Sequence, residues 1–272
     1  AHDPAIVFSS MAYINFIALA SVIGLRSSVK MIVREANLPC ATLNAFSAKW
    51  IGKLLYRSLY RKAASVIVPS NQIAAMLSND LAVPSQRISV LPNPIDVDRF
   101  RGLAIHPARI SGVGRRFVSA GRLTEQKAFD RLLEMFSRMP DKDRLTILGE
   151  GGCRQKLENL AARLGLQERV KFQGFVANPW AEYAGADAFL LTSKWEGLPN
   201  AALEALACGT PVIATPESGA INEVSALTCA RSVTLSPAGE SFIRSMYAVV
   251  ECPTLELRKS LLPSNFYKAN VL

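Results

Sequence analysis

The stretch DAFLLTSKWEGLPNAALEALACGTPVIAT, residues 187–215, decides the fold of this chain. Its opening run, 188–191, is short and wholly apolar, which is typical of a buried strand, and 211–215 has the same character. Between them the sequence predicts a polar loop and a helix that begins near Asn200 and ends at Gly209. Strand, helix and strand in this order form a βαβ unit of a parallel sheet, and such sheets bind ligands beyond the carboxyl ends of their strands.

Two carboxylates bracket this loop and helix, Glu196 before the helix and Glu204 about one turn inside it. Both can therefore face one crevice. A carboxylate can accept hydrogen bonds from two hydroxyls at once, which suits a sugar or a ribose diol. The spacing alone also fits a plainer interpretation, in which Glu204 favours its helix N-terminus and Glu196 is a solvated loop charge.

Composition indicates a globular chain. Of its 272 residues 50% are apolar and 19% charged, enough for one large domain or two modest ones. The most apolar region, 11–25, is interrupted by Asn15 and Gly24, falls short of the ~18 residues of a spanning helix and lacks a basic leader, so we expect no signal peptide. The five cysteines show neither paired nor metal-ligand spacing, which favours reduced thiols and a cytoplasmic protein.

A net charge of +9, with its basic excess concentrated in residues 1–62, predicts an acidic partner: phosphate groups, anionic lipid or nucleic acid. The predicted helix 47–64 carries much of this charge together with aromatic residues. Such a helix can lie on an anionic membrane surface. It can equally pack its apolar residues on a sheet while its cations face water. Nucleic-acid binding has less support, because cations and stacking aromatics interleave in this one helix only.

The rest of the chain alternates predicted strands and helices, which implies parallel sheets with covered faces. In the first half we expect strands at 5–9, 29–34, 65–68 and 88–91 and helices at 12–22, 47–64 and 71–77. In the second half we expect strands at 117–120, 145–148 and 170–172, and helices from Ala128 on, over 155–164 and over 240–250. The turn-rich 91–100 and the polar 102–114 form the predicted hinge and linker.

Arg122 and Lys127 fall in the loop after the 117–120 strand, five positions apart, where two cations can converge on one anion. Two solvated surface cations would show the same spacing. Gly149 and Gly151 follow the 145–148 strand at a helix start, where glycines let backbone amides approach a phosphate, although a plain tight turn needs them too.

Residues 196–212 closely resemble the donor-site signature of the retaining GT-B glycosyltransferases of family 4, the glycosyl transferases group 1: Glu-Gly-x-Pro, a second Glu eight positions after the first, then Ala, Gly and Pro-Val. The resemblance implies an α/β fold of GT-B type, with two Rossmann-like, doubly wound parallel-sheet domains of which the first is incomplete. It divides the chain into 1–108, an acceptor-side domain with hinge; 109–256, the nucleotide-sugar donor domain; and 257–272, the start of terminal helices that pack back on the first domain. Members begin with a glycine-rich turn before the equivalent of Ala5, so we expect truncation at both ends.

The resemblance also implies residue roles. Gly121-Arg122-Leu123 followed by Lys127 matches the pyrophosphate clamp of the family, with Ala128 where glycine is frequent. The implied catalytic residues are Arg122, Lys127 and Glu196. The implied donor-binding residues are Gly121, Gly149, Gly151, Phe175, Val176, Gly197, Leu198, Pro199, Asn200 and Glu204. Phe175 fits a core position as well as base stacking. Because fixed cations and helix-terminal amides can stabilise a leaving diphosphate, we expect no metal and no cofactor besides the nucleotide-diphosphate sugar as co-substrate.

The expected function is transfer of a hexosyl unit from a nucleotide-diphosphate sugar to a lipid-linked or polysaccharide acceptor, with retention, in cell-envelope glycan synthesis such as that of lipopolysaccharide. The expected location is cytoplasmic, peripheral on the inner face of the plasma membrane, with no nucleic-acid partner. One alternative is a catalytically impaired remnant that still binds nucleotide sugar, because Ala36 stands where the family often carries a histidine and neither His2 nor His106 matches.

Overall fold

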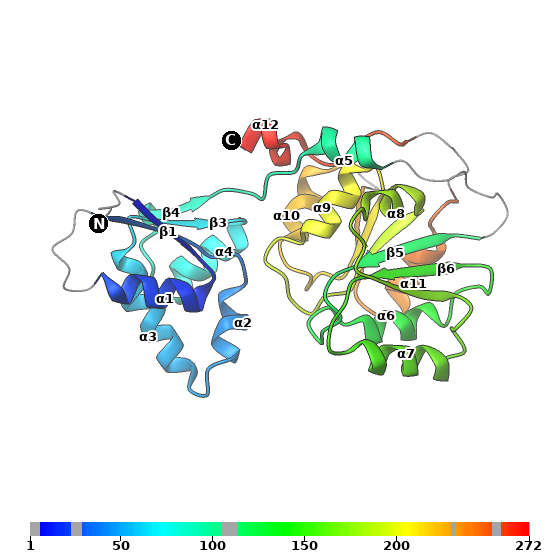
Figure 1. Cartoon of the computed structure of the whole chain (residues 1–272), viewed down its shortest axis with the longest axis horizontal. Helices are drawn as coiled ribbons and strands as arrows, with labels where there is room; N and C mark the ends of the chain where they lie inside the picture. Colours follow the sequence, from blue (N-terminus) through cyan, green and yellow to red (C-terminus); the bar gives the residue numbers. More distant parts are fainter. Residues whose placement is uncertain (1–5, 23–28, 105–113, 230–231, 252–256, 272) are drawn as a thin grey trace. The chain divides into compact units, whose positions relative to one another are not determined.

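The chain folds into two compact units. A computed structural model describes residues 6–22, 29–104, 114–229, 232–251 and 257–271 (Figure 1). Contacts group residues 1–93 with 196–198 in the first unit, and 94–195 with 199–272 in the second. The boundary that the sequence predicted at 108 lies outside the described residues, as do His2, His106 and most of the predicted linker 102–114. The structure divides the chain earlier, directly after Asn93.

The first unit is built on a parallel sheet. Its strands pair in the order β1 (Ile6–Ser10), β2 (Lys30–Arg34), β3 (Ser65–Val68) and β4 (Ile88–Val90). Its helices are α1 (Ala12–Ser21), α2 (Pro39–Asn44), α3 (Lys49–Leu59) and α4 (Asn71–Ala75), with 3₁₀ turns at Tyr60–Lys62 and Ser85–Arg87 and a π turn at Met76–Asp80. The four predicted strands are confirmed to within one residue at each end. Helix α2, which begins with Pro39, was not predicted.

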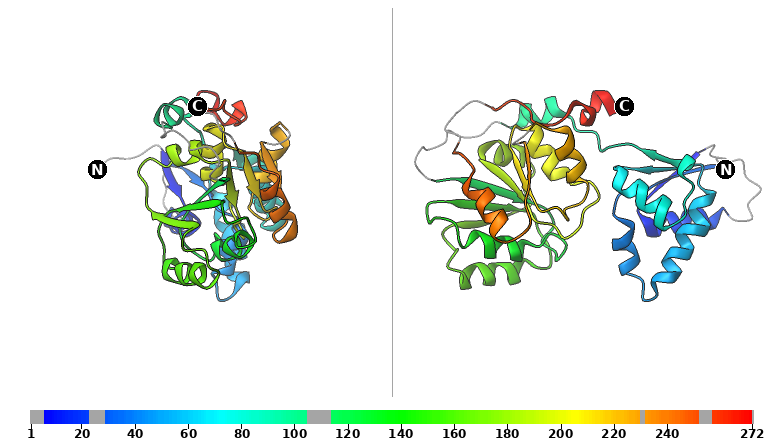
Figure 2. Two further views of the ribbon diagram at one scale, coloured as in Figure 1. Left: turned by 90° about the vertical axis from the view of Figure 1, so that its right-hand side faces the viewer. Right: turned by 180° about the vertical axis from the view of Figure 1, so that it is seen from behind.

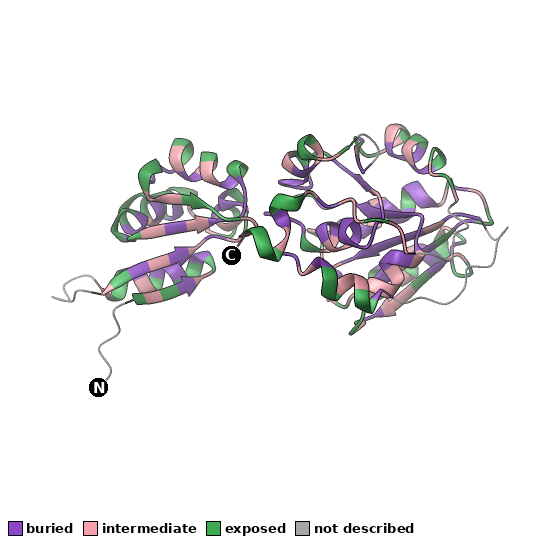
Figure 3. Cartoon of the chain, turned by 90° about the horizontal axis from the view of Figure 1, so that it is seen from above, coloured by how far each residue is buried: buried purple, intermediate pink, exposed green. Residues whose placement is uncertain are grey.

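Only one face of this sheet is well covered. Met31, Val33 and Val66 alternate along the strands and are fully buried in a core that α1, α3 and α4 complete. On the other face Ile6 and Phe8 of β1 are exposed. Figure 3 colours the chain by burial. The expectation of a sheet covered on both faces is therefore wrong for the described part of this unit, although it rests on a sound general rule for parallel sheets.

The second unit is a larger parallel sheet with strand order β10-β9-β8-β5-β6-β7. The strands are β5 (Arg116–Ala120), β6 (Arg144–Leu148), β7 (Val170–Gly174), β8 (Ala188–Leu191), β9 (Val212–Ala214) and β10 (Val233–Leu235). The helices are α5 (Val97–Leu103), α6 (Phe129–Phe136), α7 (Arg154–Arg163), α8 (Trp180–Gly185), α9 (Asn200–Ala207), α10 (Ile221–Leu227), α11 (Glu240–Tyr247) and α12 (Lys268–Val271), with a 3₁₀ turn at Ser264–Phe266. The strand order reverses between β5 and β8, so a ligand is expected beyond the carboxyl ends of those two strands.

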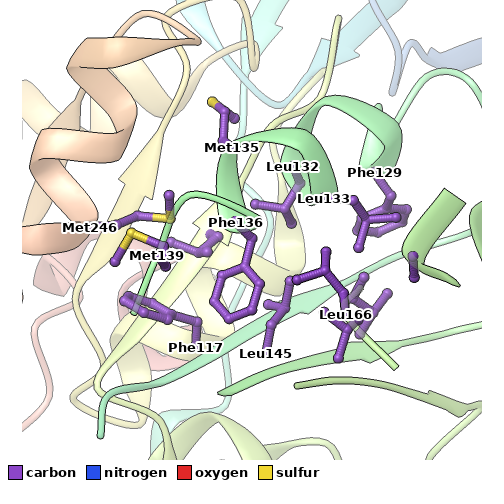
Figure 4. Packing of buried hydrophobic residues seen from close by; sticks show 14 of the residues in the cluster. Phe117, Phe129, Leu132, Leu133, Met135, Phe136, Met139, Leu145, Leu166 and Met246 are labelled. Atoms are coloured by element: carbon purple, nitrogen blue, oxygen red, sulfur yellow. The ribbon is translucent and has the colours of Figure 1, made fainter. Parts of the chain in front are cut away.

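Helices cover both faces of this second sheet (Figures 1 and 2). On one face Phe117, Leu145 and Leu190 are buried under α6, α7 and α11, as Figure 4 shows for much of this core. On the other face Phe189 packs edge-on against Tyr183 of α8, with ring centroids 5.5 Å apart. Successive residues of β8 thus point to opposite, equally apolar faces, which is why the whole strand is buried.

Three helices of the second unit, α5, α8 and α10, and the strand β10 were not predicted. Helix α5 begins inside the segment that the sequence assigned to the hinge, and the Asp96 side chain caps it by accepting a hydrogen bond from the Arg99 N–H at 3.2 Å. Ile95 also forms an isolated parallel bridge with Tyr267, so the described C-terminal segment contacts the start of the second unit. The packing of 257–272 on the first unit stays a prediction. Among the described helices, none has the length and hydropathy needed to cross a bilayer.

Candidate functional site

The predicted cations lie in the loop that follows β5. Gly121 is its first residue, with φ of +154°, and a Cβ atom built there would lie 2.6 Å from Cε of Lys127. The Lys127 side chain therefore extends back over Gly121, at the carboxyl end of the strand. Arg122 beside it is exposed. Both cations are thus at the sheet edge where parallel sheets bind ligands.

This cation loop, residues 121–128, is joined to the segment that follows β8. The Lys194 N–H donates to the Gln126 carbonyl at 2.8 Å, and the Gln126 amide donates to the Trp195 carbonyl at 2.9 Å. The Thr192 hydroxyl donates to the Lys127 carbonyl at 3.3 Å. The loops after β5 and β8 therefore pack against each other, as expected for parallel neighbours. Because Glu196, Gly197 and Leu198 group with the first unit, their predicted sugar contacts stay predictions.

Arg131 of α6 is a second link between these loops, and the sequence reasoning missed it. Its guanidinium donates to the carbonyls of Thr192 and Ser193 at 2.7 and 3.0 Å, to the Thr215 hydroxyl at 3.0 Å, and to Glu217 at 2.6 Å. It thereby fixes the chain where it leaves β8 and β9. No local pattern could have revealed this role, because the partners are more than sixty residues away in the sequence.

Gly149 and Gly151 allow the loops after β5 and β6 to pack backbone against backbone. A Cβ atom at Gly149, where φ is +123°, would lie 2.1 Å from the Gly121 carbonyl oxygen, and one at Gly151 would lie 2.5 Å from that of Leu123. Only glycine fits at such distances. The close packing explains both glycines without a ligand, and their predicted role in phosphate binding stays a prediction.

Ala128, which stands where the family often has glycine, occupies the left-handed region with φ 51° and ψ 45°. Glycine adopts this conformation without strain, whereas a side chain makes it unfavourable. Alanine in place of the family's frequent glycine therefore leaves a strained backbone at position 128, the last residue of the cation loop.

Helix α9 carries Glu204, the acidic residue of the site. Pro199 precedes it in an extended conformation, and its first turn carries no acidic side chain, so the positive end of the helix dipole is not neutralised from within the helix. Glu204, one turn further on, is half-buried, and burial raises its pKa to about 7. The indole N–H of Trp180 donates to Oε2 of Glu204 at 3.1 Å, which opposes that shift.

Trp180 itself was not among the predicted site residues. It is the first residue of α8, and its ring stacks on Phe100 of α5 with centroids 4.5 Å apart and planes 16° apart. The Asn-Pro pair before it is a helix-start signal that could have indicated this helix, although the helix was not predicted. That the indole would reach Glu204, 24 residues further along the chain, could not be predicted.

Phe175 and Val176 follow β7, where the resemblance places the nucleotide base. The Phe175 side chain is 83% exposed, so the core position that the sequence allowed for it is excluded. An exposed aromatic ring beyond a strand end is suited to stacking on a base, but its role stays a prediction.

Within the described residues, no three His, Cys, Asp or Glu side chains gather in an arrangement that could hold a metal ion, and metal independence stays a prediction. A cavity of about 840 Å³ is lined by Asp187, Val212 and Ser232, where β8, β9 and β10 begin. It therefore lies at the opposite edge of the sheet from the cation loop and is not part of this site.

The first unit carries a buried acid of its own. Glu35 follows β2, is 1% exposed, and accepts hydrogen bonds from the hydroxyls of Tyr60 at 2.5 Å and Tyr56 at 3.2 Å. Burial raises its pKa to about 7. The next residue is Ala36, at the position where the resemblance places a histidine.

Comparison with known proteins agrees with this architecture. The pattern of the family Glycosyl transferases group 1 matches residues 108–261, and that of Glycosyltransferase Family 4 matches residues 2–99. The chain is similar to an uncharacterized glycosyltransferase of Methanocaldococcus jannaschii, with 29% identity over 79% of the chain and 54% of that protein. It is also similar to the N-acetylgalactosamine-N,N'-diacetylbacillosaminyl-diphospho-undecaprenol 4-alpha-N-acetylgalactosaminyltransferase of Campylobacter jejuni, with 28% identity over 77% of the chain and 57% of that enzyme.

Among solved structures, the Anabaena protein HepE in complex with UDP superposes with a TM-score of 0.72 at 19% identity, over 89% of this chain and 67% of that one. This likeness concerns the fold, which is of GT-B type with two Rossmann-like bodies. The chain spans about half the length of the two curated relatives. Since a single family pattern covers more than half of its residues, the chain belongs to the group 1 glycosyl transferases.

Proposed function

We propose that this chain is the nucleotide-sugar-binding part, with a portion of the acceptor side, of a retaining glycosyltransferase. The enzyme would move a hexosyl unit from a nucleotide-diphosphate sugar to a lipid-linked or polysaccharide acceptor in cell-envelope glycan synthesis. One observation carries the proposal: the loops after β5 and β8 are hydrogen-bonded to each other at the switch point of the second sheet, and they bring Lys127 and the N-terminus of α9 to the same edge.

The reaction requires stabilisation of the leaving diphosphate as its negative charge grows. Arg122 and Lys127 would supply positive charge, Arg122 with a fork that can chelate a phosphate and Lys127 as a point charge. The α9 N-terminus adds backbone amides and the positive end of its dipole. Groups held in place before the reaction stabilise developing charge without reorganising, so this design needs no metal.

The remaining roles concern the sugar and the ribose. We assign the ribose hydroxyls to Glu204 and the transferred sugar to Glu196 with the 197–200 backbone. Phe175 and Val176 would hold the base. The assignment to Glu204 is consistent with its half-buried position, because a carboxylate shielded from water makes stronger hydrogen bonds to a diol.

The surface of α3 supports a lipid-linked acceptor at an anionic membrane. Its inward side buries Tyr56 and Leu59 in the core, while Trp50 and Leu54 are 68% and 53% exposed beside the exposed cations Lys49, Lys53 and Arg57. Exposed apolar side chains among cations suit the headgroup region of a bilayer. The Campylobacter relative is named for a diphospho-undecaprenol acceptor, which is a lipid of this kind. We therefore propose a cytoplasmic, peripheral membrane protein.

Calorimetry with UDP, GDP and ADP, followed by transfer of labelled sugar from the matching nucleotide sugar, tests the proposal. We expect one nucleoside diphosphate to bind in the presence of EDTA, and Lys127→Ala to weaken that binding at least tenfold. Lys171→Ala, which removes an exposed cation from β7, is the matched control. If none of the three nucleotides binds, the proposal is wrong.

A second function has one specific observation in its favour. Ala36 cannot donate or accept a proton or polarise a sugar hydroxyl, whereas a histidine at that place could. A chain that binds the nucleotide but transfers no sugar would be the catalytically impaired remnant. Ala36→His would then be expected to restore measurable transfer without changing nucleotide affinity.

A further inference from the structure

The contact between Trp180 and Glu204 assigns a role to a residue outside the family signature. The bond from the indole N–H reaches one carboxylate oxygen, Oε2. A hydrogen bond to one oxygen restricts the orientation of the carboxylate and so limits the directions in which its other oxygen can point. The residue that holds it therefore decides where the free oxygen points.

Trp180 is in turn held rigidly. The face of its ring lies on Phe100, nearly parallel at 4.5 Å between centroids, and Phe100 belongs to α5, which packs on α8 and α9. Stacked aromatic rings of this kind contribute beyond their buried area and restrict each other's rotation. Three side chains are thus in contact in series from α5 through α8 to α9: Phe100, Trp180 and Glu204.

From this geometry we propose that Trp180 is a positioning residue for nucleotide binding: its indole N–H fixes the Glu204 carboxylate so that the second oxygen receives the ribose hydroxyls of the donor. The inference rests on the proposed function, since it takes Glu204 as the ribose acceptor. The proposal adds Trp180, which does not touch the substrate but orients Glu204, which does. Phe100 supports the arrangement by holding the indole.

The bond also changes the charge state of Glu204, which gives the proposal a distinctive signature. Burial raises the pKa of Glu204 to about 7, and the Trp180 N–H lowers it from what burial alone would give. Loss of the N–H should raise this pKa further, so a larger fraction of Glu204 is protonated at pH 7. An acceptor that must be ionised then binds the ribose less well at pH 7 and recovers at higher pH.

Other groups near Glu204 do not titrate in the same range. Tyr183 of α8 has its pKa raised above the ordinary value by burial and by Glu204, and burial raises the pKa of the Cys208 thiol at the end of α9 to about 12. The cations near Cys208, Arg101 of α5 and Arg258, donate to backbone carbonyls, Arg101 to those of Ala207 and Arg258, and Arg258 to those of Ala184 and Ala186. A change in binding between pH 6 and 9 that depends on Trp180 therefore reports on Glu204.

The decisive variant is Trp180→Phe, which keeps an aromatic ring to stack on Phe100 but lacks the pyrrole part of the indole and its N–H. With whichever of UDP, GDP and ADP binds the wild-type chain best, calorimetry from pH 6 to 9 should show affinity reduced three- to tenfold at pH 7. The midpoint of the pH profile should move to higher pH. The 2′,3′-dideoxy form of the same nucleotide should lose little between the two proteins, because it has no hydroxyls for Glu204 to accept.

Tyr247→Phe is the matched control, because it removes one side-chain donor, the bond to the Arg138 carbonyl at 3.0 Å, from α11 on the other face of the same unit. Its affinity and pH midpoint should equal those of the wild type. Thermal melting of both variants excludes general unfolding. If Trp180→Phe binds with wild-type affinity and an unchanged pH midpoint, the inference is overturned while the proposed function stands. If the wild type binds none of the nucleotides, the proposed function itself fails.

Discussion

Glu35 and Glu204 are the same chemical group with the same direction of pKa shift, yet they occupy two different kinds of environment. Glu35, after β2 of the first unit, is 1% exposed and is enclosed by the hydroxyls of Tyr56 and Tyr60. Glu204, in α9 of the second unit, is half-buried and accepts a hydrogen bond from the Trp180 indole. Burial raises the pKa of both to about 7.

The difference teaches that a raised pKa does not by itself identify a functional acid. Glu35 is held in a closed polar network, in which Asn15 donates to the Tyr60 hydroxyl and to the Arg34 carbonyl while the Ser9 hydroxyl donates to Asn15. Such satisfied networks stabilise a unique core. Glu204 is half-buried, and its neighbour Trp180 can orient it. The two glutamates therefore differ in how exposed their side chains are, and not in their pKa.

The largest effect we expect is on ligand binding, from Glu204→Gln. The substitution keeps the size of the side chain but removes the negative charge that strengthens hydrogen bonds to the ribose. Two charge-assisted bonds contribute about 1.5–3 kcal/mol each, so nucleotide affinity should fall by about 3–6 kcal/mol, at least a hundredfold. Calorimetry measures it. Glu35→Gln is the comparison variant, and its nucleotide affinity should be unchanged. An equal loss of nucleotide affinity in both variants would show that the two acids do not differ in function.

The next effect concerns the pH dependence of stability. Burial raises the pKa of Glu35 from its ordinary value of 4.5 to about 7, so the folded state binds the proton more tightly than the unfolded state. The stabilisation is therefore fully present below about pH 4.5 and is lost as the pH rises through 7, a change on the order of 3 kcal/mol. Urea unfolding of the first unit from pH 4.5 to 8 measures it. Glu35→Gln should flatten this slope, and a slope that persists would show that another group causes it.

A smaller loss is expected from Tyr60→Phe. The variant removes the shorter of the two hydroxyl bonds to Glu35 and leaves a buried acceptor with one donor fewer. The unfolding free energy of the first unit should fall by about 1–2 kcal/mol, measured by urea unfolding at pH 5. Tyr13→Phe, on the exposed side of α1, is the control and should stay within about 0.5 kcal/mol of the wild type. Nucleotide binding should not change in either variant.

The smallest effects should come from relieving backbone strain at the two sheet edges. Met11, between β1 and α1, has φ of 79° and is 61% exposed, and Ala128, before α6, has φ of 51° and is buried. Met11→Gly should stabilise its unit by about 0.5–1 kcal/mol, because glycine adopts positive φ without strain. Ala128→Gly should gain less, since it also loses a buried methyl group. Thermal melting compares the two, and a larger gain at Ala128 would contradict this order.

The sequence predicted the second unit well because its elements are locally encoded. Buried apolar runs such as 188–191 are typical of strands in a covered parallel sheet, and Gly209, with φ of +80°, ends α9 as its position predicted. The short helices α2, α5, α8 and α10 were missed, because six or seven residues carry too little periodicity to stand out from turn signals such as Pro94 and Pro179. The one-sided cover of the first sheet was missed for a related reason, since alternation in a strand does not tell what lies on its outer face.

By itself the amino-acid sequence determined the family, the parallel βαβ architecture, the positions of Arg122 and Lys127 after a strand, and that of Glu204 in a helix that follows a strand. These follow from short-range spacing, which a parallel sheet converts into a shared edge. The tertiary structure alone decided that Trp180 holds Glu204, that Arg131 fixes the ends of β8 and β9, and that Glu35 is sealed by two tyrosines. Each of these contacts joins residues 20 or more positions apart through side-chain geometry, and no local pattern encodes a hydrogen bond made across the packing of two helices or a helix and a strand end.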